Sequence, residues 1–131
     1  MRDLGATRMY AKKLAPNDNS KNQVYLGGDF SVLNIIPHGE IYSDDEDKAG
    51  SKRERAKARV RFFWVSENGK HHAPDANLIL YPKYPEVRMS GFLKGCDDPP
   101  SDVMTVRDAD RVLVIGITAD GEVLGYAAAA G

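Results

Sequence analysis

Apolar and polar positions alternate along several short segments of the chain, which is typical of strands that bury one face. The clearest case is 59–65, where Val60, Phe62 and Trp64 point to one side and the intervening residues to the other. This pattern predicts a strand whose apolar side chains belong to the core.

Further short strands are predicted on both sides of this segment, separated by residues that favour turns. They cover 8–14, 23–26, 77–81, 87–90, 111–118 and 122–126. Asp120-Gly121 between the last two is a strong signal for a hairpin. Pro82 and Pro85 predict an extended or edge path for the strand after them, because proline cannot donate to a sheet ladder.

The remaining segments carry weaker patterns. Residues 29–36 are compatible with a short helix capped by Asp29 or with a buried strand, and Pro37 ends either one. Residues 43–51 are expected to form an acidic loop. Residues 52–58 are too few and too charged for a stable isolated helix, so we expect loop or strand extension there.

These elements predict a mainly β (α+β) fold, with about seven strands in a barrel or half-open barrel and one or two short helices. The 131 residues suffice for one core, and no repeat or internal boundary interrupts them, so we expect a single domain over 1–131. The final segment 125–131 resembles a strand cut short or the start of a linker. We therefore expect the chain to be the N-terminal part of a longer polypeptide.

Composition narrows the functional classes. No apolar run approaches the roughly 20 residues that cross a bilayer, so we expect a soluble protein without a membrane partner. The single cysteine, Cys96, excludes an internal disulfide framework and a multi-cysteine zinc site. Together with the lack of a secretory signal at the start, it predicts a cytoplasmic location. The net charge of -1 argues against a uniformly basic nucleic-acid binder.

The charge is unevenly distributed, which changes that last conclusion. Residues 48–61 hold seven basic residues against Glu54, a net +6, and run directly into the predicted strand. Arginine can bind guanine edges bidentately and lysine neutralises phosphates, so this block is a candidate DNA contact. The alternative is a solvated charged loop. The acidic run 44–47 is expected to pair with the block when DNA is absent.

A second polar segment, 12–23, carries both phosphate-binding and base-binding residue types. Its lysines are Lys12, Lys13 and Lys21, and its amides are Asn17, Asn19, Asn22 and Gln23. Amide side chains can pair bidentately with adenine. Taken alone, the cluster is more typical of turn-forming Asn and Asp residues than of a DNA contact. With the basic block it forms two polar segments that could embrace a duplex.

At these residues the sequence resembles the N-terminal effector-binding domain of EcoRII-type restriction endonucleases, and related domains fused to nucleases of the MvaI/BcnI kind. The first segment, similar to that family's first strand and N-terminal recognition arm, is Tyr10-Ala11-Lys12-Lys13-Leu14-Ala15-Pro16-Asn17-Asp18-Asn19-Ser20, continuing to Asn22-Gln23-Val24. The second, in the place of the other recognition arm, is Lys52-Arg53-Glu54-Arg55-Ala56-Lys57-Ala58-Arg59-Val60-Arg61. Two differences from the family are the shorter chain and the acidic run 44–47.

The resemblance implies a DNA-binding pseudobarrel, shared with a plant transcription-factor domain, whose two arms grip the major groove of double-stranded DNA. It implies a short, near-palindromic target of the CC(A/T)GG type, either an effector or a cleavage site, bound and not cut by this domain. The parent protein would be a bacterial type II restriction endonuclease. Its fused nuclease domain would use Mg²⁺, whereas this domain would need no cofactor and would be monomeric when isolated. The candidate DNA-binding residues are Lys12, Lys13, Asn17, Asp18, Asn19, Lys21, Asn22, Gln23, Lys52, Arg53, Glu54, Arg55, Lys57, Arg59 and Arg61.

Two alternative functions come from other classes. A self-contained Mg²⁺-dependent nuclease of the PD-(D/E)xK kind needs two acidic groups and a lysine. The nearest strings are Asp75 with Glu86-Val87-Arg88, and Asp29 with Glu46-Asp47-Lys48. A protein-interaction barrel could instead dock a peptide through the aromatic residues around Pro82 and Pro85, although core packing explains those residues better.

The remaining histidines and the cysteine do not suggest a site. His71-His72 follows the turn Asn68-Gly69, and adjacent histidines in a turn do not share the face that a zinc-binding helix offers. His38 is expected in a loop. Acidic neighbours on one side of Cys96 disfavour a nucleophilic thiol.

Overall fold

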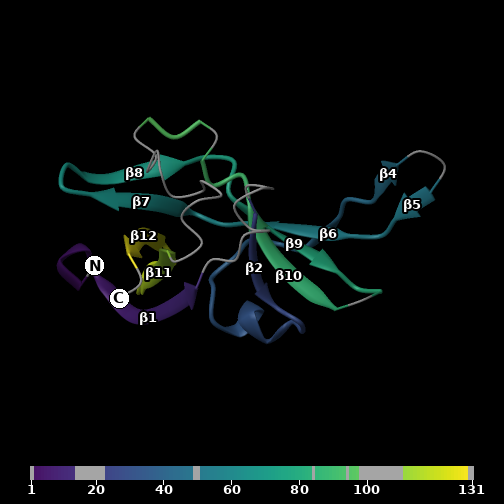
Figure 1. Ribbon diagram of the computed structural model, residues 1–131, viewed down its shortest axis with the longest axis horizontal. Helices are drawn as coiled ribbons and strands as arrows, with labels where there is room; N and C mark the ends of the chain where they lie inside the picture. Colours follow the sequence, from purple (N-terminus) through teal and green to yellow (C-terminus); the bar gives the residue numbers. More distant parts are fainter. Residues whose placement is uncertain are drawn as a thin grey trace.

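The computed structural model describes residues 2–13, 23–48, 51–83, 85–93, 95–97 and 111–129. Over these residues the fold is mainly β, with two short 3₁₀ helices, η1 (Arg2–Leu4) and η2 (Ser31–Asn34), which confirms the predicted fold class. Two five-stranded sheets form the body, and a separate two-stranded hairpin extends away from them (Figure 1).

The first sheet has the order β1-β11-β12-β7-β8. Its strands are β1 (Ala6–Lys13), β11 (Arg111–Thr118), β12 (Val123–Ala129), β7 (Phe62–Ser66) and β8 (Gly69–Ala73). All neighbours are antiparallel except β12 and β7, which run parallel. The hairpin predicted at Asp120-Gly121 joins β11 to β12.

The second sheet has the order β2-β10-β9-β6-β3 and is antiparallel throughout. Its strands are β2 (Val24–Gly27), β10 (Glu86–Ser90), β9 (Asn77–Tyr81), β6 (Ala56–Arg59) and β3 (Tyr42–Ser43). The hairpin consists of β4 (Glu46–Lys48) and β5 (Ser51–Arg53), and lies between β3 and β6 in the chain.

The two sheets are joined where the chain passes from β6 to β7, at Val60 and Arg61. Three backbone hydrogen bonds hold this crossing segment (residues 59–61). Val60 N donates to the Ala76 carbonyl at 3.1 Å, and the Arg59 carbonyl accepts from Gly39 N at 2.8 Å. The Arg61 carbonyl accepts from Val123 N at 2.8 Å. Because the partners come from three parts of the chain, the backbone here has little freedom.

The core lies beside the crossing segment and is built on its alternating apolar side chains. Val60, Phe62 and Trp64 are all buried, as their spacing predicts. Phe62 and Trp64 pack edge to face with ring centroids 4.9 Å apart, and the Trp64 ring also lies against Phe92. Trp64 Nε1 donates to the Phe92 carbonyl at 2.6 Å, so its one polar atom is satisfied within the core.

The structure corrects four of the sequence predictions. The acidic segment is not simply a loop, because β3, β4 and the start of β5 lie within or beside it, and the pairing sets Glu46 opposite Arg53 and Asp47 opposite Lys52. Opposite charges on facing strands favour such pairing. The elements β3, β4, β5, β6 and β8 also raise the number of strands among the described residues to twelve, above the seven or so expected.

The other two corrections concern His71-His72 and β10. The histidine pair lies on β8, after the turn and not within it. β10 lies between β2 and β9 and is not an edge strand. Pro82 and Pro85 fall in the turn before it, so neither removes a donor from its ladder.

The segment 29–36 takes the helical alternative, as a single 3₁₀ turn. Asp29 is not its N-cap, a position held by Phe30 without a side-chain hydrogen bond. The Asp29 carboxylate instead accepts a hydrogen bond from Ser31 N at 2.9 Å. A hydrogen bond from the Ser31 side chain, and then this backbone one, lower the pKa of Asp29. Among the described residues, no helix is long and apolar enough to cross a membrane.

The parallel pairing of β7 with β12 depends on Gly125, which lies opposite Trp64 in the register. A Cβ atom at this position would overlap the ring of Phe62. We expect Gly125→Ala to lower the free energy of unfolding by about 1–3 kcal/mol, the usual cost of overpacking a core. Urea unfolding followed by Trp64 fluorescence measures this.

Gly39→Ala is the matched control, because a Cβ there would meet its nearest atoms at ordinary contact distance, 3.8 Å or more. We expect it to change stability by less than about 0.5 kcal/mol. Equal stability of the two variants would show that the Phe62–Gly125 contact does not constrain the fold.

Candidate nucleic-acid interface

The basic block begins in the hairpin and ends at the crossing segment. In Figure 1 the hairpin lies at one extreme of the molecule, joined to the second sheet through β3 and β6. Lys52 and Arg53 lie on β5, Glu54 and Arg55 between β5 and β6, Lys57 and Arg59 on β6, and Arg61 just before β7. The candidate residues therefore extend from the hairpin along β6 into the body.

Asp44 pairs with two of these cations. Its carboxylate lies 3.1 Å from Arg55 Nη2 and 3.1 Å from Lys57 Nζ, and its carbonyl accepts from Arg55 Nε at 2.8 Å. The Arg55 side chain is only 17% exposed. The hydrogen bond from Lys57 is the main reason that the pKa of Asp44 lies below its usual value, and the charge of Arg55 adds to it.

Asp45 pairs with a third cation, Lys52, at 3.3 Å. Its carboxylate also accepts from Arg55 N and Ser43 Oγ, each at 3.4 Å. The hydrogen bond from Lys52 is the largest cause of the lowered pKa of Asp45. For Asp44 and Asp45 the expected internal pairing is therefore confirmed, and both remain anionic competitors for the basic block. The side chains of Glu46 and Asp47 lie outside the described structure.

Arg53 is held against the second sheet by an aromatic ring. Its guanidinium carbon lies 4.2 Å from the centroid of Tyr81, a cation–π contact, and that of Arg88 lies 5.5 Å from the same ring. Arg88 pairs with Glu86 at 2.9 Å and donates to the Gln23 amide oxygen at 3.2 Å. The amide oxygen of Gln23 is therefore already hydrogen-bonded to Arg88. The remaining candidate, Glu54, is exposed at the end of the hairpin.

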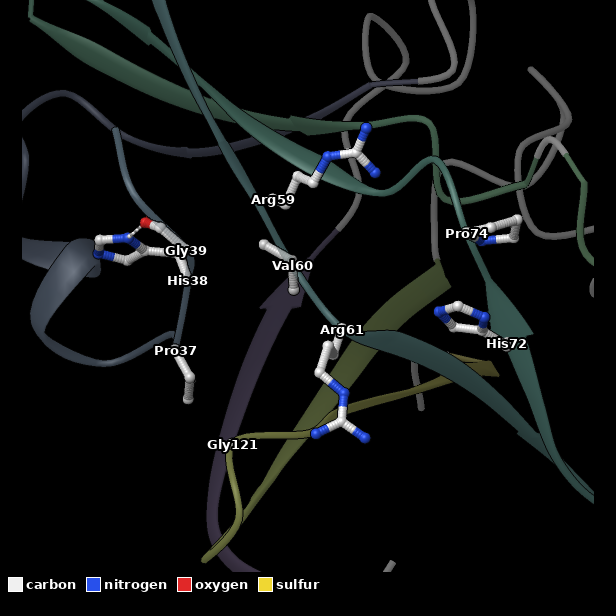
Figure 2. Close-up of a pocket in the computed structure, with 9 residues that line it drawn as sticks. All are labelled: Pro37, His38, Gly39, Arg59, Val60, Arg61, His72, Pro74 and Gly121. Atoms are coloured by element: carbon white, nitrogen blue, oxygen red, sulfur yellow. Dashed lines mark hydrogen bonds between the residues drawn. The ribbon is translucent and has the colours of Figure 1, made fainter. Parts of the chain in front are cut away.

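Arg59 and Arg61 lie at the opposite end of the block, where the sheets meet. Both are exposed and border a cavity of about 490 Å³ (Figure 2). The cavity is lined by Pro37, His38, Gly39, Arg59, Val60, Arg61, His72, Pro74 and Gly121. Figure 2 shows the two guanidinium groups diverging from the crossing segment, with His72 facing it from β8. The lining combines cationic or hydrogen-bonding side chains with apolar ones and holds no carboxylate.

The two arginines differ in how they are engaged. Arg61 Nη2 lies 3.3 Å from the buried Glu122 carboxylate, which Lys70 also approaches at 2.6 Å, yet the Arg61 side chain remains 62% exposed. Arg59 forms no side-chain hydrogen bond or ion pair with any residue in the described part of the chain. Arg59 is thus the most available guanidinium of the basic block.

The second polar segment is described only at its ends. Lys12 and Lys13 close β1, where Lys12 Nζ lies 5.7 Å from the centroid of the Tyr25 ring and Lys13 is exposed. The candidates Asn17, Asp18, Asn19, Lys21 and Asn22 lie outside the described residues.

Strand pairing places the end of this segment level with Arg59 and not with the hairpin. A row of paired residues across the second sheet consists of Val24, Met89, Leu78 and Ala58. The start of β2 is therefore level with Ala58, next to Arg59, at about 14 Å across three strand spacings. The hairpin leaves the sheet at the other end, beside Ala56. Arg59 thus lies level with Gln23, whereas the hairpin lies at the other end of β6.

The two acidic residues of the first nuclease-like motif, Asp75 and Glu86, do not lie next to each other in the structure. Asp75 lies just before the start of β9, the end that pairs with Ser90. Glu86 pairs with Tyr81, at the opposite end of β9. Glu86 is already bound to Arg88. Among the described residues, no three His, Cys, Asp or Glu side chains gather as a metal site would require.

The aromatic residues considered for peptide docking belong to the core, as packing arguments favoured. Tyr81 is 6% exposed and Phe92 1% exposed, while Tyr84 lies outside the described residues. His71 Nδ1 lies 3.1 Å from the Asp97 carboxylate, and the half-buried Cys96 thiol lies near the His71 carbonyl. His71 and Cys96 therefore make local structural contacts, with each other and, for His71, with Asp97.

Sequence reasoning missed the cavity and its two histidines. His38 and His72 were expected in a loop and a turn, and neither was assigned to a site. His38 Nδ1 donates to the Gly39 carbonyl at 2.8 Å. No local pattern could have found the cavity, because its lining comes from four separate segments of the chain.

No family model matches this sequence, and no curated protein or solved structure is significantly similar to it. The resemblance to the EcoRII-type domain, with its pseudobarrel and DNA target, therefore stays a prediction.

Proposed function

We propose that this chain is a double-stranded DNA-binding domain and that the basic block forms its contact surface. The observation that carries the proposal is the presentation of Arg59 and Arg61 at the crossing segment. Both are exposed, their backbone is held by hydrogen bonds on both sides, and Arg59 has no side-chain partner among the described residues. Two exposed guanidinium groups on a fixed backbone suit a ligand with regularly spaced negative charges.

Duplex DNA has the chemistry that this arrangement requires. Two residues apart on an extended backbone, Arg59 and Arg61 have Cα atoms separated by roughly 6–7 Å, so they can reach neighbouring phosphates of one strand. Guanidinium groups bind phosphate oxygens bidentately and can do the same to a guanine edge. Lys52, Arg55 and Lys57 extend the positive surface toward the hairpin once their carboxylate partners are displaced.

The finer part of the proposal concerns specificity and biological role. We place the domain in a type II restriction endonuclease that acts in the cytoplasm, where it recognises a CC(A/T)GG-like site as effector or target. The nuclease domain and its Mg²⁺ would lie elsewhere in the protein. The resemblance of 10–24 and 52–61 to the two recognition arms supports this role. The position of Arg59, level with the start of β2 next to Gln23, supports a grip that uses both polar segments.

An anisotropy titration with a CC(A/T)GG duplex and a scrambled duplex of the same composition tests the proposal. We expect tighter binding to the first. We expect Arg59→Ala to weaken it by about 1–3 kcal/mol if the side chain contacts a base. Lys57→Ala should weaken binding to both duplexes alike, because a phosphate contact carries no sequence information.

The outcomes separate the two parts of the proposal. Equal affinity for the two duplexes would contradict sequence specificity and leave DNA binding in place. No binding of either duplex at low salt would contradict the proposed function altogether.

The pairing of Asp44 with Arg55 and Lys57 generates a second expectation. Binding DNA must displace the Asp44 carboxylate from both cations, so its removal should favour the complex. We expect Asp44→Asn to raise affinity for both duplexes by several-fold, because the variant lacks the carboxylate that competes with phosphate for Arg55 and Lys57. Parallel titrations of the variant and the parent measure the difference.

Glu67→Gln is the matched control for this variant. It removes one negative charge from the exposed turn between β7 and β8, away from the hairpin. A general charge effect would raise affinity equally in both variants and would contradict a specific competition by Asp44.

A further inference from the structure

The cavity at the crossing segment has features that a phosphate contact alone does not explain. We propose that it binds one nucleotide of the DNA, with the base held outside the base stack; this inference rests on the proposed function and assigns a ligand to the cavity. The nucleotide phosphate would lie against Arg59, with the neighbouring phosphate of the strand within reach of Arg61, and the base would lie against the apolar part of the lining.

The size of the cavity fits such a ligand. Its volume is about 490 Å³, within the roughly 300–1,000 Å³ usual for small-molecule sites. A bare phosphate would occupy only a small part of it. The cavity is open to solvent at the exposed side chains of Arg59, Arg61 and His72, so a nucleotide attached to a strand could enter from the surface (Figure 2).

The charge of the cavity fits the phosphate. No carboxylate belongs to the lining, and the buried Glu122 beside Arg61 is engaged by Arg61 and Lys70. Arg59 has no competing side-chain partner among the described residues, so an anion that binds it displaces no internal ion pair. Binding should therefore depend more on Arg59 than on Arg61.

The apolar and aromatic lining fits the base. Pro37, Val60 and Pro74 give the cavity surfaces that phosphate cannot use. The His72 ring is supported from β7 by Phe63, with ring centroids 5.0 Å apart and planes at 33°. A planar side chain backed by a second ring is a suitable platform for an unstacked base, since base stacking tolerates any sequence.

Titration of the whole chain with deoxyadenosine 5′-monophosphate, followed by amide NMR shifts, tests the inference. We expect saturable shifts at His38, Gly39, Arg61, His72 and Gly121. Inorganic phosphate and deoxyadenosine should each bind at least about tenfold more weakly, because each offers only part of the contacts, and tenfold corresponds to about 1.4 kcal/mol.

Arg59→Ala should weaken mononucleotide binding by about tenfold or more, as expected for loss of a charge-assisted hydrogen bond. Arg53→Ala is the matched control, because Arg53 lies against Tyr81 and not in the cavity. If Arg59→Ala does not retain a dispersed amide spectrum, Arg59→Gln replaces it. Absent shifts at the cavity, equal binding of inorganic phosphate, or equal weakening by Arg53→Ala would overturn the inference.

A duplex carrying 2-aminopurine separates this inference from the proposed function. Anisotropy reports whether the duplex binds, and fluorescence of 2-aminopurine rises where a base leaves the stack. We expect a rise at one position of the bound duplex, reduced in Arg59→Ala. A duplex that binds without a rise at any position would overturn the inference and leave DNA binding in place. A duplex that fails to bind would overturn the proposed function, and the mononucleotide titration would then decide whether the cavity binds nucleotides.

Discussion

The crossing of one chain segment from the second sheet to the first is the constraint on which the rest of the structure depends. Val60, Phe62 and Trp64 bury its apolar side, and three backbone hydrogen bonds fix its path between β6 and β7. The parallel pairing of β7 with β12 then requires Gly125, since any side chain there would meet Phe62. Because the apolar side is committed to the core, Arg59 and Arg61 are left on the outside at a defined place.

Charge is organised around this segment, so the net charge of -1 describes the surface poorly. Asp44 and Asp45 neutralise the cations nearest the hairpin, whereas Arg59 at the other end has no side-chain partner among the described residues. The same basic block therefore contains an internally compensated part and an available part. Such a surface favours a ligand that first meets Arg59 and Arg61 and then competes for Arg55 and Lys57.

Local patterns predicted those parts of the fold that local physics decides. Alternation placed Val60, Phe62 and Trp64 in the core, and Asp120-Gly121 gave the last hairpin. Prediction failed for the hairpin, because the charged segments 46–48 and 51–53 lack the alternation of apolar and polar residues that marks a strand. It failed equally for the cavity, since His38 and His72 become neighbours of Arg61 only when four segments meet.

The salt dependence of duplex binding tests the central claim most directly, that Arg59 and Arg61 neutralise DNA phosphates. Each neutralised phosphate contributes about 0.9 to the slope of log Kobs against log salt concentration. The parent chain should therefore give a slope of several units in magnitude. A variant combining Arg59→Ala with Arg61→Ala should lose about two of these units, one for each contact. A slope near zero in the parent, or an unchanged slope in the double variant, would contradict the account.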